Sequence, residues 1–236
     1  MTTKISLAAI VAASAALLTP GLASAHVSVA GPAYANTTFE AVFGVGHGCD
    51  GADTYSVKVV IPAGVTSVRA LDATLGKAVT EKDTSGNVVS ITWTKDVADV
   101  LPGDLNYYKL PVRMRLPNAP FTTLLFPTYQ VCRDQQGNIT STDWVGTGNE
   151  PANPDGAPPP EPAPALTLLP ARVPGWNKFT VPARLTNLSI FNDAEIVWSG
   201  NAAYSVNPNY KELITTEPDT TALTEIAANS VIWVKY

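Results

Sequence analysis

Apolar and polar residues alternate along several short stretches of this chain, and turn-forming residues separate the stretches. Apolar side chains recur at every second position in residues 54–61 and 88–94, the spacing that places them on one face of a β-strand. Residues 107–116 and 123–132 are two further strand candidates. Because no stretch of 26–132 shows a comparable period of 3.6, the sequence predicts an all-β fold, an antiparallel sandwich.

The composition changes after the last of these strands. Residues 146–164 are dominated by Gly, Asn and Pro and include the run Pro-Pro-Pro-Glu-Pro, which is typical of an exposed, semi-rigid spacer. We therefore expect a sandwich over 26–145, a Pro/Gly-rich linker over 146–173 and a small β-rich C-terminal extension over 174–236, in which 213–228 is a candidate helical turn. At roughly 60 residues the extension is marginal for a core of its own, so we expect it to pack on the sandwich.

The first 25 residues have the pattern of a cleaved secretory signal. Lys4 precedes a short apolar run that ends at Pro20, and small residues lead up to Ala25. The run is too short to span a bilayer comfortably, and no later stretch approaches the length of a transmembrane helix. The sequence therefore predicts export, periplasmic localisation and a mature chain without a membrane span.

Several functional classes lack support in this sequence. Fifteen Lys and Arg against twenty Asp and Glu give a net charge of −5, so there is no basic surface for a nucleic acid. The chain contains two histidines, and neither stands in a Gly-x-Ser-x-Gly context, so a hydrolase triad is not indicated. No phosphate-binding loop or dinucleotide fingerprint is present either.

Both cysteines, Cys49 and Cys132, lie in the part predicted to be exported. An oxidising compartment favours a disulfide between them. A thiolate that binds a metal ion is the alternative. Their separation excludes a Cys-x-x-Cys redox centre.

Cleavage after Ala25 makes His26 the first residue of the mature chain. An α-amino group and an imidazole then belong to one residue, and the amine nitrogen and ring Nδ1 can close a chelate ring on a metal ion. The unperturbed pKa of an α-amino group is near 8, so a strongly bound cation can displace its proton at neutral pH. Nitrogen donors of this kind favour Cu(II). The alternative is that a histidine stands at this position by chance.

A second group of candidate ligands lies in the segment Gly-His-Gly-Cys-Asp-Gly, residues 46–51. Its glycines permit tight backbone geometry and a close approach to a ligand. If Cys49 is oxidised, His47 and Asp50 remain as candidate metal ligands. The alternative interpretation is a turn held in place by Cys49.

Together, three motifs resemble the YcnI-like family of exported copper-binding domains. They are the start His-Val-Ser-Val at His26, the segment 46–51 with Val-Lys-Val-Val-Ile-Pro after it, and the run Tyr-Gln-Val-Cys that ends at Cys132 and is followed by Trp144. The resemblance covers residues 26 to about 150. The C-terminal extension resembles extensions in Gram-negative members of the family.

This resemblance implies an immunoglobulin-like or fibronectin-like sandwich that holds one Cu(II). His26 matches the N-terminal histidine of the family's copper site, and Trp144 matches a tryptophan whose ring shields the ion; without the resemblance, Trp144 is interpreted as a packing residue. The family also uses a carboxylate, and members without the Gly-His-Gly-Cys segment have a Glu in that neighbourhood. The candidates that this chain offers there are His47 and Asp50, with Glu40 and Asp53 behind them.

The function predicted from these observations is a periplasmic Cu(II)-binding protein that is not an enzyme: a copper chaperone, buffer or acquisition factor. A membrane copper transporter or another periplasmic copper protein is the expected partner. One alternative is a structural or protein-interaction domain without a physiological metal. Another is a copper-dependent oxygenase, which needs a second histidine that His47 alone could supply.

Overall fold

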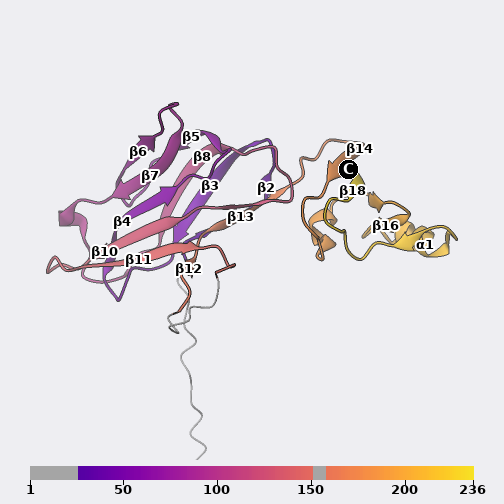
Figure 1. The fold of residues 1–236 in the computed structure, drawn as a ribbon. Helices are drawn as coiled ribbons and strands as arrows, with labels where there is room; N and C mark the ends of the chain where they lie inside the picture. The colour runs from indigo at the N-terminus through magenta and orange to yellow at the C-terminus, as the bar shows by residue number, and fades with distance from the viewer. Residues whose placement is uncertain (1–25, 151–157) are drawn as a thin grey trace, which may run out of the picture.

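The computed structural model describes residues 26–150 and 158–236 (Figure 1). The predicted signal sequence, 1–25, lies outside the described residues. Strands dominate the regular structure, and α1 (Pro208–Thr216) is the one α-helix within the described residues. The predicted all-β fold class is therefore confirmed. No helix in these two segments is long and apolar enough to cross a membrane.

Two sheets form the sandwich, with strand orders β1-β3-β8-β5 and β12-β11-β10-β4-β7-β6. The four-stranded sheet consists of β1 (Ser28–Val29), β3 (Thr38–Val45), β5 (Thr66–Ala70) and β8 (Tyr108–Arg115). The six-stranded sheet consists of β4 (Asp53–Val60), β6 (Lys77–Lys82), β7 (Val88–Thr94), β10 (Thr128–Arg133), β11 (Ile139–Gly146) and β12 (Glu161–Pro162). Neighbouring strands are antiparallel except for β11 and β12, which are parallel. A short 3₁₀ turn, Val97–Asp99, follows β7.

The sandwich core follows the alternation seen in the sequence. On β8, Leu110, Val112 and Met114 are fully buried, whereas the residues between them are partly or fully exposed. They join a cluster that includes Trp93 of the facing sheet. Each such side chain contributes roughly 1.5–3 kcal/mol when it is fully buried. The alternation of apolar and polar residues therefore determines which face of each strand lies in the core.

The predicted disulfide is confirmed. Cys49 and Cys132 are bonded, with their Cα atoms 5.6 Å apart. No free cysteine occurs among the described residues. The alternative of a thiolate metal ligand is therefore contradicted.

The structure differs from the predicted linker over 146–173. After the Pro-rich run the chain returns to the sandwich as β13 (Ala165–Leu169), which pairs with β2 (Ala33–Tyr34) and β9 (Thr123–Leu125) in a three-stranded sheet. Leu166 and Leu168 are buried in the sandwich core. Proline is compatible with the edges of sheets, so a Pro-rich composition did not exclude strands here.

The C-terminal extension has its own five-stranded sheet and its own core. Its sheet has the order β14-β18-β15-β16-β17, and the strands are β14 (Trp176–Thr180), β15 (Ile196–Ser199), β16 (Ala202–Tyr204), β17 (Thr221–Ala222) and β18 (Val231–Lys235). A 3₁₀ turn, Leu188–Phe191, precedes β15. The helical turn predicted over 213–228 overlaps α1 only over 213–216. The helix begins earlier, because Asn207 caps it and Pro208 occupies its first turn, and β17 lies within the remainder of the predicted range.

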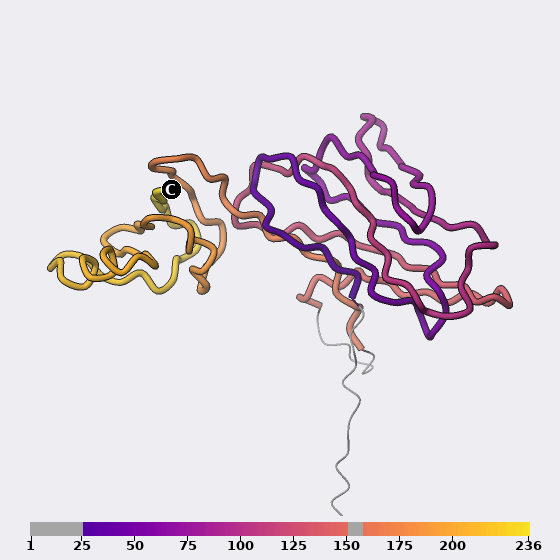
Figure 2. Tube along the Cα trace, turned by 180° about the vertical axis from the view of Figure 1, so that it is seen from behind, coloured from indigo at the N-terminus to yellow at the C-terminus, as the bar shows by residue number. Residues whose placement is uncertain are grey.

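The extension contacts one end of the sandwich (Figure 1 and Figure 2). Phe121, in the loop before β9, lies with its ring centroid 5.9 Å from those of Phe179 and Phe191 in the extension's core. On the same border Arg172 lies over the ring of Tyr34, 4.5 Å from its centroid. Arg172 precedes the extension and also forms an ion pair with Asp193 within it. Phe121 and the contacts of Arg172 therefore join the extension to the sandwich.

Tyr236 provides a measurable probe of this border. Burial, together with the negative charge of Asp193, raises the pKa of Tyr236 to about 12. The folded protein therefore favours the neutral phenol; this stabilises the fold fully below the ordinary tyrosine pKa near 10 and is lost as the pH rises toward 12. We expect an ultraviolet titration of the wild type to contain a late phenol ionisation that Tyr236→Phe removes. Exposed Tyr107→Phe is the control, and identical late phases in wild type and Tyr236→Phe would contradict the assignment.

Candidate functional site

Three side chains from distant parts of the sequence meet at one lateral edge of the sandwich. His26 precedes the edge strand β1, Trp144 lies on β11, and Glu161 lies on the edge strand β12. The ring centroids of His26 and Trp144 are 5.4 Å apart, with their planes at 47°. His26 Nε2 lies 4.0 Å from Glu161 Oε2. The structure thus brings the predicted pair His26 and Trp144 together with a carboxylate, and we name this cluster the His26 site.

The pairing of β12 with β11 places Glu161 in this cluster. Trp144 and Glu161 are partners in the register of the two parallel strands, so they are neighbours although 17 positions separate them in the sequence. The side chains of His26 and Glu161 are 37% and 52% exposed. A cation in solution can therefore reach both of them.

A buried glutamine fixes the orientation of Trp144. The indole Nε1 donates a hydrogen bond to Gln130 Oε1 at 3.1 Å, and the indole is almost completely buried. Gln130 Nε2 in turn donates to the backbone oxygen of His47 at 2.7 Å and to Thr54 Oγ1 at 2.9 Å. An indole N–H can only donate, so this bond uses its one polar function. Trp144 is consequently both a member of the sandwich core and the neighbour of His26.

The side chain of His47 is engaged elsewhere. Its Nδ1 lies 3.2 Å from the backbone oxygen of Gly48 and 3.9 Å from Asp104 Oδ2. Its backbone oxygen accepts a hydrogen bond from Gln130, the residue that also holds the indole of Trp144. The imidazole of His47 therefore lies beside Gly48 and Asp104.

The predicted carboxylates Asp50, Asp53 and Glu40 have three different surroundings. Asp50 has a positive φ of 51° in an exposed turn and lines a small hollow with Asp134 and Thr140. Asp53 is buried and bonded to Lys95 and Tyr108, so its oxygens are not available to a metal ion. Glu40 stands opposite Arg113 on the outer face of the four-stranded sheet.

The side chains of the His26 site can hold a small metal ion only if the α-amino group of His26 also acts as a ligand. Among residues 26–150 and 158–236, no group of three or more His, Cys, Asp or Glu side chains is arranged to hold a metal. His26 and Glu161 supply two such side chains. The α-amino nitrogen that cleavage after Ala25 would release would be a third donor, and it would belong to His26 itself.

Sequence reasoning did not find Glu161 and Gln130. Glu161 was assigned to the linker because prolines surround it, yet it is the one charged residue in the run Pro-Pro-Pro-Glu-Pro, and that was the available signal. Gln130 lies within the motif Tyr-Gln-Val-Cys that ends at Cys132, and a polar residue at an inward position of a strand indicates a hydrogen-bond partner.

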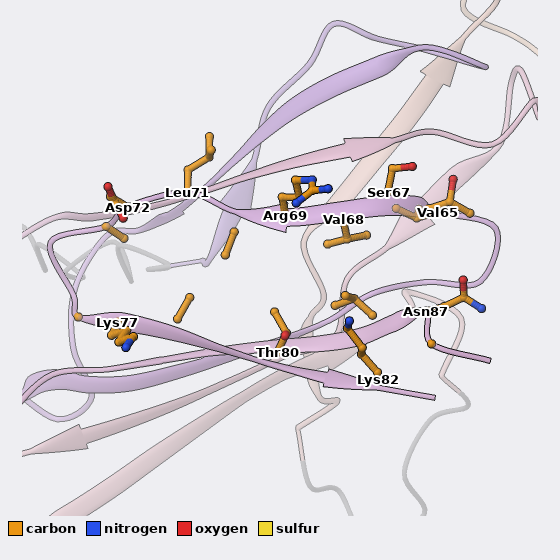
Figure 3. Close-up of a pocket in the computed structure, with 17 residues that line it drawn as sticks. Val65, Ser67, Val68, Arg69, Leu71, Asp72, Lys77, Thr80, Lys82 and Asn87 are labelled. Carbon is orange, nitrogen blue, oxygen red and sulfur yellow. The ribbon is translucent and has the colours of Figure 1, made fainter. Parts of the chain in front are cut away.

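A separate hollow of about 1020 Å³ lies at the opposite lateral edge, between the edge strands β5 and β6. Figure 3 shows the side chains that line it, among them Val68, Arg69 and Lys82. The register of both strands is interrupted by an irregularity, and charged side chains with such irregularities are what keep exposed sheet edges from pairing with other chains. We therefore interpret this edge as protected rather than functional.

Comparisons with known proteins place the sandwich in a family. The chain is 29% identical to an uncharacterized protein from Nocardia farcinica that is described as having an immunoglobulin-like fold, over 62% of this chain and 99% of that chain, with a TM-score of 0.46. It is 12% identical to a variant of BcpA, the major pilin subunit of Bacillus cereus, over 86% of this chain and about half (51%) of the pilin chain, with a TM-score of 0.35. A comparison with curated proteins gave no match. The model of a family described as a domain of unknown function, DUF1775, matches residues 26–168, which is more than half of the sequence and ends inside β13. The protein therefore belongs to the DUF1775 family, which is the YcnI-like family.

Proposed function

We propose that this protein is exported to the periplasm, where the His26 site binds one Cu(II) ion as cargo, for delivery, buffering or acquisition. The observation that supports this proposal is the meeting of His26, Trp144 and Glu161 at one accessible edge of the sandwich. The resemblance of the N-terminal motifs to exported copper-binding domains points the same way. A membrane copper transporter or another periplasmic copper protein is the proposed partner.

The chemistry of the donor set suits Cu(II). Once cleavage has freed the amine, the amine and imidazole nitrogens of His26 form a chelating pair, and imidazole-type donors favour copper over the other divalent ions of the first row. Glu161 adds a negatively charged oxygen that lowers the net charge of the bound ion. The face of Trp144 covers one side and keeps water away from it. A set of few protein ligands leaves positions open, which release of the ion to a partner requires.

The decisive experiment compares two chain starts. Protein that begins at His26 is titrated with Cu(II) beside protein that retains Ala25, and binding is followed by calorimetry and electron paramagnetic resonance. We expect the retained residue to weaken binding at least as much as the roughly 10–100-fold that loss of an outer-shell partner costs at metal sites, because it converts the amine into an amide. Equal affinity and equal spectra for the two proteins would refute the proposal.

Glu161→Gln tests the carboxylate. The substitution keeps the shape of the side chain and removes its charge, so we expect Cu(II) affinity to fall by about 10–100-fold with no loss of folded structure. Glu40→Gln is the matched control, because Glu40 is exposed on the other sheet and is expected to leave affinity unchanged. If Glu161→Gln binds copper as tightly as the wild type, the oxygen donor lies elsewhere.

His47→Ala separates a site with one histidine from a site with two. Because the imidazole of His47 faces Asp104, we expect the electron paramagnetic resonance spectrum of the copper-loaded protein to stay unchanged. A loss of nitrogen hyperfine structure in this variant would instead place His47 among the ligands.

A further inference from the structure

The C-terminal extension carries a pocket of about 320 Å³ that is separate from the His26 site. In the five-stranded sheet, Val197 and Val234 are register partners that point into the extension's core. Trp198 and Trp233, one position further along, are also partners and lie on the opposite face. The helix α1 covers part of that face, and the pocket lies between the helix and the sheet.

Three aromatic side chains from three elements line the pocket. They are Trp176 on β14, Trp198 on β15 and Tyr210 on α1. Trp176 is 53% exposed, so its ring is open to a ligand. Trp198 and Tyr210 pack on a small buried cluster around Ile196 and Ile214, which holds these two rings in place. The pocket therefore has a rigid aromatic wall and an accessible one.

The charge around the pocket is negative. Lys235 lies in the wall, but its Nζ is 2.6 Å from Glu195 Oε2, and this contact raises the pKa of Lys235. Glu217 also lines the pocket and has no ion-pair partner in the part of the chain that the structure describes. Glu217 is the C-terminal cap of α1, and the last turn of this helix holds no basic residue. The negative end of the helix dipole therefore adds to the charge of Glu217.

We propose that this pocket binds a small organic cation with a quaternary ammonium group. The methyl groups of such a cation fit an apolar aromatic pocket, and the negative faces of Trp and Tyr rings attract its positive charge. Glu217 supplies the counter-charge at the rim. The volume lies at the lower end of the range for ligand pockets, roughly 300–1,000 Å³, and suits a headgroup of this size.

The polarity of the lining distinguishes this ligand class from sugars. A sugar needs several hydrogen-bond partners, whereas a quaternary ammonium group donates no hydrogen bond. Apart from Glu217 and the paired Lys235, the polar groups of the lining are the hydroxyls of Tyr210 and Thr220 and the indole N–H groups of Trp176 and Trp198. Most of the lining surface is nonetheless apolar, and Glu217 is its one charged side chain outside an ion pair. This composition favours a cation that is recognised by contact and charge.

The test uses the full chain and two ligands of nearly equal shape. Choline is titrated beside 3,3-dimethylbutan-1-ol, in which a neutral tert-butyl group replaces the trimethylammonium group, and tryptophan fluorescence and calorimetry report binding. We expect choline to bind about tenfold more tightly than the alcohol. Equal affinity for both ligands, or no binding of choline, would overturn the proposal.

Variants locate the binding site on the extension. Trp198→Phe, which keeps an aromatic ring but removes the indole, and Glu217→Gln are each expected to weaken choline binding about three- to tenfold. Trp233→Phe and Glu212→Gln are the matched controls, because neither residue lines the pocket, and both are expected to bind choline like the wild type. Choline affinity that is unchanged in Trp198→Phe and Glu217→Gln would show that the cation binds elsewhere and would overturn the assignment.

Discussion

Replacing Cys49 and Cys132 with alanine is expected to lower the free energy of unfolding by about 4.5 kcal/mol. The bond joins residues 83 positions apart, and a cross-link that closes so long a loop removes much of the conformational entropy of the unfolded chain. For a chain of this length the loss corresponds to a fall in Tm of about 9–18 °C. Urea denaturation followed by circular dichroism measures it.

Reduction of the wild-type protein provides the matched control for this variant. The reduced wild type and the double alanine variant both lack the cross-link, but only the variant also lacks the sulfur atoms. If loop closure is the cause of the stability loss, the two proteins therefore unfold at the same urea concentration. A stability loss below about 1 kcal/mol in both would mean that the unfolded chain is already compact and would contradict the entropic account.

The same bond affects the proposed copper site indirectly. It ties the segment 46–51 to β10, the strand from which Gln130 reaches both the backbone of His47 and the indole of Trp144. Without the cross-link this hydrogen-bond chain is expected to loosen, so Trp144 is held less firmly against His26. The double alanine variant should therefore bind Cu(II) more weakly than the wild type, even at temperatures where it stays folded.

Most of the sandwich was predictable because a half-buried strand leaves a local signature. The alternation at 54–61 and 88–94 became β4 and β7, and 107–116 contains β8. The single strand predicted over 123–132 is divided into β9 and β10 by Phe126 and Pro127, and β10 extends to Arg133. The pairing of strands leaves no such signature. The short strand β12 has no alternation to read, and its two residues, Glu161 and Pro162, are defined only by their parallel pairing with β11.

In the candidate site, too, local features could be predicted from the sequence and sheet pairing could not. His26 was predictable because its chemistry depends on one cleavage position and one residue type. His47 and Asp50 were suggested by their closeness in the sequence, yet a tight turn points neighbouring side chains in different directions: the imidazole of His47 lies beside Asp104, and Asp50 lines a hollow with Asp134 and Thr140. Their role as ligands stays a prediction. Glu161 joins the site through sheet pairing across a Pro-rich segment, which no spacing rule describes.

Lys95→Met is expected to destabilise the protein by about 3–5 kcal/mol. Lys95 Nζ donates to Asp53 Oδ2 at 2.5 Å and to the hydroxyl of Tyr108 at 2.6 Å, and that hydroxyl donates to Asp53 Oδ1 at 2.8 Å. Lys95 and Asp53 are 6% and 1% exposed. Removal of the cation leaves a buried carboxylate without its counter-charge, which costs far more than the loss of an exposed pair. The free energy of unfolding in urea measures the effect.

Two comparisons establish that burial is the cause. The pair Lys58 and Glu81 has a similar N–O distance, 2.8 Å, but is exposed, so Lys58→Met is expected to cost less than about 1 kcal/mol. Adding Asp53→Asn to Lys95→Met removes the buried charge that lacks a partner and keeps a side chain that can bond to Tyr108, so the double variant should regain a large part of the lost stability.

Asp53 also accepts a hydrogen bond from the backbone of Leu101, and it thereby fixes the loop that carries Asp104 beside His47. A cost for Lys95→Met no larger than that for Lys58→Met would mean that water solvates Asp53 in the folded protein, and the loop would then need another anchor.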